Sequence, residues 1–231
     1  MSSFSGFDQE PSNVSELVDK MEAFENFLRD ENRESFIPFL RAYRRITEKV
    51  QRQKNSFDNP SELEKLDLEF GKLYFDAMKA YFREGKKVMP WRNYLNYMER
   101  NDSRPLLELL LGINAHINAD LAVLLDEMDY SEEEDFNRVN RILLESLYPV
   151  LIDTAHMRRD FEALTFLSSG PLPFYGLNKI ICWRQKAWKE RYRTQEEIKK
   201  QTEKKACDLI SLRHDRSFTG ILKKPFRIIE A

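Results

Sequence analysis

Along most of this chain, apolar residues recur every three or four positions, which is the spacing of helices with one buried face. We find no alternating strand pattern in the chain and no repeat of 20 to 50 residues. The sequence therefore predicts an all-α fold. The expected helices cover about 13–28, 36–53, 61–85, 91–98, 105–128, 132–164 and 177–205.

The segment 105–128 is the most apolar, and Pro105 suits the first turn of a helix. Its middle reads Gly-Ile-Asn-Ala-His-Ile-Asn-Ala-Asp-Leu over 112–121 and contains four polar side chains where a core helix should have none. Burying polar groups is costly unless each is bonded, so these four indicate a network that fixes the fold or binds a ligand. We expect a single bundle of about seven helices around this buried helix. The four are Asn114, His116, Asn118 and Asp120.

Helical geometry divides these four residues into two pairs. Because each residue turns a helix by about 100°, Asn114 and Asn118 share one face, and His116 and Asp120 share a nearly opposite one. Other parts of the protein should therefore contact this helix on both sides. Glycine costs about 1 kcal/mol against alanine inside a helix, so Gly112 indicates the close approach of another element.

The His116–Asp120 pair fits two kinds of chemistry. Four-residue spacing on a helix can bind a divalent metal, or it can place a carboxylate where it orients a histidine base. In either case the site would bind a small ligand or metal and could be hydrolytic, with Asn114 and Asn118 holding the substrate. In the alternative interpretation, the network only fixes helix packing, and the protein is a non-catalytic interaction protein.

A second histidine, His156, lies between Asp153 and Asp160 at helical spacing. Three such groups on one arc could bind a cation, but neighbouring arginines favour a solvated, self-paired surface. If His156 faced His116, the two could share a metal. The sequence does not establish that contact.

Composition narrows the function classes. A chain of 231 residues with 42% hydrophobic and 33% charged residues can form one sizeable core with a wet surface. Its seven glycines form no phosphate-binding loop, and a net charge of −2 gives no argument for nucleic acid. The basic segment 186–205 contains four glutamates and is typical of a solvated helix, so nucleic-acid or anionic-surface binding is the least favoured hypothesis.

The remaining features concern organisation and compartment. Cys182 and Cys207 fall on one expected helical segment, too far apart to pair. No apolar run approaches the roughly 20 residues of a membrane span, and the N-terminus does not resemble a signal peptide, so we expect a cytoplasmic protein. We expect a flexible N-terminus over 1–12, a helical domain over 13–192, and a charged helix extension with a C-terminal tail over 193–231.

The decapeptide at 112–121 resembles the G-[IM]-N-A-H-I-N-x-D-L signature of an uncharacterised helical domain family found mainly in bacteria. The resemblance covers about 39–188, although Trp183 stands where that family has alanine. It implies an all-helical fold and adds Asn140 to the constellation around His116, but it does not identify a substrate. Supporting matches are Tyr43 with Ile46-Thr47, Phe57-Asp58 with Pro60, Leu66-Asp67, Phe70, Leu73-Tyr74-Phe75, Trp91, Val139-Asn140, Trp183-Arg184 and Ala187-Trp188.

Overall fold

A computed structural model describes residues 3–157 and 172–211, and these residues form helices without any strand. The predicted all-α fold is confirmed. The α-helices are α1 (Val14–Asp30), α2 (Ile37–Arg52), α3 (Pro60–Glu84), α4 (Arg92–Met98), α5 (Pro105–Ala115), α6 (Leu121–Glu127), α7 (Glu133–Met157), α9 (Leu172–Glu190) and α10 (Gln195–Ser211). The short turns are η1 (Ser5–Asp8), η2 (Glu34–Phe36), η3 (Lys54–Ser56) and η4 (His116–Asp120).

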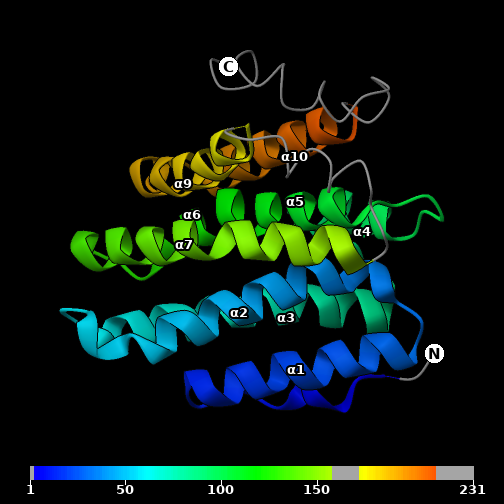
Figure 1. Ribbon diagram of the computed structural model, residues 1–231, viewed down its shortest axis with the longest axis horizontal. Helices are drawn as coiled ribbons and strands as arrows, with labels where there is room; N and C mark the ends of the chain where they lie inside the picture. Colours follow the sequence, from blue (N-terminus) through cyan, green and yellow to red (C-terminus); the bar gives the residue numbers. More distant parts are fainter. Residues whose placement is uncertain (1–2, 158–171, 212–231) are drawn as a thin grey trace.

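The helices stack in layers (Figure 1). Helix α1 lies at one side, α2 and α3 follow, α4 to α7 form the middle, and α9 with α10 cover the opposite side. Helix α5 contacts α2, α4, α7 and α10. The segment that sequence analysis placed at the centre is therefore surrounded by four other helices.

The described residues contain nine α-helices rather than about seven because two of the expected helices are divided. The segment 105–128 contains a π-helical turn, η4, between α5 and α6, in which the Leu121 amide donates to the His116 carbonyl five residues earlier. The expected final helix is two helices, because Thr194 caps the start of α10: its hydroxyl accepts from the Glu197 amide and donates to the Glu197 carboxylate. Cys182 and Cys207 therefore lie on different helices.

Other helix ends follow local sequence signals. Asn13 caps α1 by accepting from the Glu16 amide, and Gly85 ends α3 in the left-handed conformation with φ of 65°. Helix α3 is capped by Asn59, whose side chain accepts from the Glu62 amide, and Pro60 occupies the first helical position. Pro149 lies inside α7 rather than ending it. The rest of the expected helix to 164 lies outside the described residues.

The central segment is packed closely enough to explain its glycine. A Cβ atom at Gly112 would lie 2.4 Å from Cγ of Phe39 on α2, so the expected close approach is confirmed. The stretch Pro105–Glu127 is long and apolar enough to cross a membrane by length and composition, but 83% of its most apolar window is buried inside the structure. It has the burial of a core helix, and no other stretch in the described ranges meets that test.

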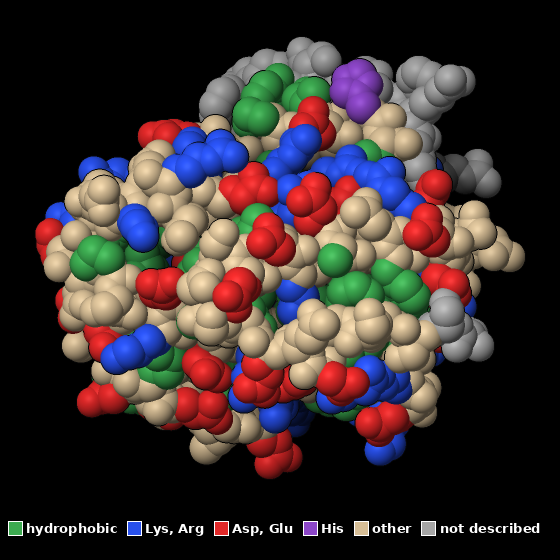
Figure 2. All heavy atoms as spheres, turned by 90° about the horizontal axis from the view of Figure 1, so that it is seen from below, with side chains coloured by type: hydrophobic (Ala, Val, Ile, Leu, Met, Phe, Trp, Pro, Cys, Tyr) green, Lys and Arg blue, Asp and Glu red, His purple; other side chains and the backbone are tan. Residues whose placement is uncertain are grey.

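Charged side chains of both signs are interspersed over the face drawn in Figure 2. Several take part in ion pairs that join helices, and the most buried is centred on Glu25 of α1. Its carboxylate pairs with Arg29, with Arg41 and with Arg44, so this buried charge is fully compensated. We therefore assign it a packing role between α1 and α2.

Candidate functional site: a cavity beside His116

His116 lies in a cage of aromatic rings. Its imidazole stacks on Phe70 of α3 with ring centroids 3.4 Å apart and planes within 7°. Tyr43 and Phe39 of α2 approach its edge at centroid distances of 4.5 and 5.5 Å. Only 3% of His116 is exposed, because helices on either side of the cage exclude water.

The two ring nitrogens of His116 have different surroundings. Nδ1 lies 3.3 Å from Oδ2 of Asp120, and the same oxygen accepts the indole N–H of Trp91 at 3.0 Å. Nε2 is buried and has no hydrogen-bond partner in the part of the chain that the structure describes. One nitrogen is therefore held by protein, and the other is available to a bound molecule.

Burial controls the charge of this pair. It lowers the pKa of His116 well below the usual value, with a smaller contribution from the positive charge of Arg184. It also raises the pKa of Asp120 to about 8, although the Trp91 hydrogen bond opposes this shift. His116 is therefore neutral at pH 7. When Asp120 ionises, Oδ2 can accept both N–H groups, and Nε2 then carries the free lone pair.

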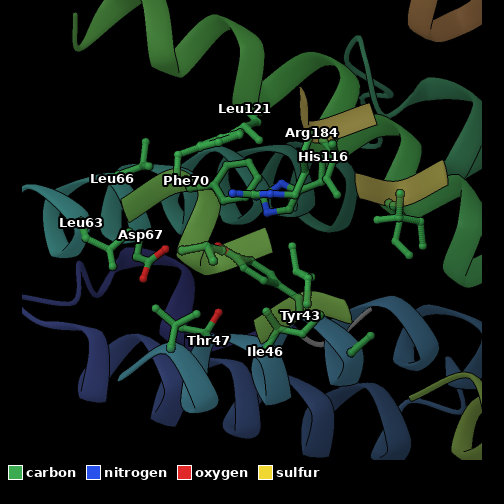
Figure 3. Close-up of a pocket in the computed structure, with 18 of the residues that line it drawn as sticks. Tyr43, Ile46, Thr47, Leu63, Leu66, Asp67, Phe70, His116, Leu121 and Arg184 are labelled. Carbon is green, nitrogen blue, oxygen red and sulfur yellow. The ribbon is translucent and has the colours of Figure 1, made fainter. Parts of the chain in front are cut away.

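A cavity opens beside this imidazole (Figure 3). Its volume is about 70 Å³. Because one water needs roughly 10–15 Å³ by this measure, the cavity has room for about five waters or a compact organic molecule. Its walls come from α2, α3, α5, η4, α6, α7 and α9 and are mostly aliphatic and aromatic.

Two ionisable side chains from distant parts of the sequence also line the cavity, Asp67 of α3 and Arg184 of α9. Burial raises the pKa of Asp67 to about 7 and lowers that of Arg184 to about 10. Nε of Arg184 donates to Oδ1 of Asn140 at 2.7 Å, and its guanidinium lies 4.5 Å from the ring centroid of Phe136. Neither Asp67 nor Arg184 was among the predicted site residues, and the sequence signal for them was that both lie in segments that resemble the helical family, Leu66-Asp67 and Trp183-Arg184.

The asparagines lie on the opposite side of the central helix. Nδ2 of Asn114 donates to the Thr202 carbonyl of α10 at 3.0 Å, and its Oδ1 accepts from Asn118 at 3.1 Å. Oδ1 of Asn118 accepts from Lys205 at 2.7 Å. Both faces inferred from helical spacing are thus in contact with other helices. The asparagine amides bond to each other and to α10, and neither asparagine lines the cavity beside His116.

Of the other residues predicted to belong to a site, Asn140 contacts a cavity residue and His156 does not. Asn140 bonds to Arg184 in the cavity wall, and its Nδ2 is buried without a partner among the described residues. His156 is exposed on α7, whereas His116 is buried, so the two histidines do not share a site. Asp153, which precedes His156 on the same helix, forms an ion pair with Arg45 of α2. Asp160 lies outside the described residues. No group of three or more His, Cys, Asp or Glu side chains in the described ranges could hold a metal.

Comparison with known proteins places the chain in a family. No curated protein and no solved structure matches it. A family of unknown function, DUF5995, matches residues 14–221, which include every helix from α1 to α10 described above. The chain therefore belongs to the DUF5995 family of unknown function.

Proposed function

We propose that the protein binds a small, mainly apolar organic molecule in the cavity beside His116, and that Nε2 of His116 exchanges a proton with it. The observation that supports this proposal is a buried imidazole nitrogen without a partner in a cavity wall. Leaving a buried polar atom unsatisfied costs about 1–3 kcal/mol. A bound molecule that completes this hydrogen bond accounts for its retention.

The arrangement favours general-base catalysis, and we propose hydrolysis as the reaction. In its ionised form, which predominates above its pKa of about 8, Asp120 accepts the Nδ1–H of His116, so that Nε2 can take a proton from water as the water oxygen attacks an ester or amide carbonyl. Addition of water across that bond gives a carboxylic acid and an alcohol or amine. A positioned base of this kind typically contributes about 10²–10⁴ in rate.

A metal-dependent version of this proposal has weaker support. His116 and Asp120 would be two ligands, but Asp120 already accepts from Trp91, and the exposed His156 does not join them. A catalytic zinc site usually has three protein ligands. The donor set therefore fits a base held by a carboxylate better than a metal centre.

The packing-only interpretation has its own supporting observation, which concerns the other face of the helix. Asn114, Asn118, Thr202 and Lys205 form an uninterrupted set of hydrogen bonds between α5–η4 and α10. No cavity is needed to explain them. We therefore propose a packing role for the asparagines and a ligand role for His116.

The proposal is tested with His116→Phe, which removes both nitrogens but keeps a ring on Phe70. Hydrolysis of p-nitrophenyl butyrate should fall at least tenfold, and binding of the neutral fragment hexanamide, followed by amide chemical shifts around the cavity, should weaken. His156→Phe is the matched control, because it removes an exposed histidine from α7. Equal hydrolysis by the parent and both variants would overturn the catalytic proposal. Failure of both hexanamide and its carboxylate analogue hexanoate to shift any cavity resonance would overturn ligand binding there.

A further inference from the structure

Arg184 is a buried cation whose terminal nitrogens are not used by the protein. It is 6% exposed, and its Nε donates to Asn140. Among the described residues, its two terminal nitrogens have no hydrogen-bond acceptor, and no carboxylate forms an ion pair with it. One face of the guanidinium lies on Phe136, which fixes its plane. The free nitrogens therefore belong to a rigidly held group in a cavity wall.

Such a group is expensive to bury alone. Taking a charge out of water costs several kcal/mol unless a partner compensates it. Asp67 lines the same cavity and attracts Arg184, but it forms no ion pair with it and lies apart from it in Figure 3. A guanidinium with Nε already engaged still has four N–H donors on its two terminal nitrogens, and the two that point away from the side chain in parallel match the two oxygens of a carboxylate.

The other groups in the cavity restrict the charge of the occupant. A cation would meet Arg184, which cannot lose its proton at neutral pH. A dianion such as phosphate would meet Asp67 and have a single cationic partner among the lining residues. A monoanion is balanced by Arg184, and the apolar walls fit a hydrocarbon chain or ring behind the charge.

We propose that the cavity binds a small monocarboxylate with an apolar body, whose carboxylate pairs with the terminal nitrogens of Arg184. This inference rests on the proposed function and names the ligand class of the same cavity. It also agrees with the proposed reaction, because a carboxylic acid is one product of ester or amide hydrolysis. Nε2 of His116 and the hydroxyl of Tyr43 belong to lining residues and have no hydrogen-bond partner among the described residues, so they would be the polar atoms left to the rest of the molecule.

The experiment compares three probes of one length at pH 7: hexanoate, hexanamide and hexylamine. Binding to the full chain is measured by titration calorimetry and by amide chemical shifts. Hexanoate should bind at least tenfold more tightly than hexanamide, and hexylamine should not bind. If hexanamide binds as tightly as hexanoate, or hexylamine binds best, the inference is overturned while binding in the cavity stands. If none of the three binds there, both this inference and the proposed function fail.

Two substitutions in the cavity lining should change hexanoate binding in opposite directions, and they test whether Arg184 binds the carboxylate. Arg184→Met should remove the preference for hexanoate over hexanamide, whereas Arg191→Met, which removes a cation stacked on Trp188 outside the cavity lining, should keep it. At pH 8, where Asp67 is mostly ionised because burial raises its pKa to about 7, Asp67→Asn should tighten hexanoate binding severalfold, because it removes a negative charge from the same cavity. If Arg184→Met does not fold by circular dichroism, Asp67→Asn decides, and weaker or unchanged hexanoate binding in that variant would overturn the inference.

Discussion

The two faces of the central helix carry similar polar residues in very different states. On one face, Asn114 and Asn118 are bonded to each other and to α10. On the other, His116 is bonded through one nitrogen, and its second nitrogen is buried at a cavity wall without a partner in the described structure. Burial of polar groups is therefore not by itself evidence of function.

What distinguishes the faces is whether the hydrogen bonds are complete. A satisfied buried network contributes to specificity of packing and needs no further explanation. An unsatisfied atom next to an available volume costs stability, so its presence favours a role outside folding. The comparison predicts that substitutions on the asparagine face should affect stability most, and that those on the histidine face should affect binding most.

The largest loss of stability is expected from Asn114→Ala. This substitution removes the donor to the Thr202 carbonyl and the acceptor of Asn118 together, so α10 loses a buried attachment to α5. We expect the free energy of unfolding to fall by about 2–4 kcal/mol in urea denaturation. Asn118→Ala, which removes one less buried amide, should cost less. If Asn114→Ala unfolds at the parent midpoint, the packing role of this face is wrong.

An intermediate effect is expected from the pH dependence of stability. Burial raises the pKa of Asp120 to about 8, so the native protein holds this proton more firmly than the unfolded chain. That stabilisation is complete below the unfolded pKa of 3.8 and is lost as pH rises to about 8. Between pH 5.5 and 8.5, the free energy of unfolding of Asp120→Asn should therefore fall by about 3 kcal/mol less than that of the parent.

The control for the pH experiment is Asp126→Asn, which changes an exposed carboxyl on the following helix, α6. The free energy of unfolding of Asp126→Asn should change with pH in the same way as that of the parent. Asp67→Asn should also lose less free energy of unfolding than the parent as pH rises, as Asp120→Asn does. For Asp67 this difference should develop by about pH 7, because burial raises the pKa of Asp67 to about 7. Parallel curves for the parent and Asp120→Asn would show that Asp120 is not held in its neutral form.

The smallest change in stability is expected from His116→Phe. A phenyl ring of similar size keeps the stack on Phe70 and leaves Trp91 bonded to Asp120, while the long contact of Nδ1 is lost. We expect less than about 1 kcal/mol of change in urea denaturation, although hydrolysis and ligand binding should fall as described above. A loss as large as that of Asn114→Ala would mean that both faces serve packing.

Much of this arrangement followed from local patterns, but its boundaries did not. Helical spacing identified the central helix and its two polar faces, and Gly112 indicated the contact with Phe39. The π turn at η4 was not anticipated, because it depends on how the surrounding helices pack rather than on local propensity. The division between α9 and α10 could have been predicted from Thr194 and Glu197, because their spacing matches the sequence signature of a helix N-terminus, and the Thr194 hydroxyl accepts from the Glu197 amide.

Sequence by itself determined the all-α class, the buried central helix and the pairing of His116 with Asp120, because helix periodicity and four-residue spacing are properties of neighbours along the chain. Only tertiary structure decided which polar face meets α10 and which meets a cavity, and it alone brought Asp67 and Arg184 beside His116. Contacts between residues more than 40 positions apart depend on packing of whole helices, and a single sequence contains no local signal for them.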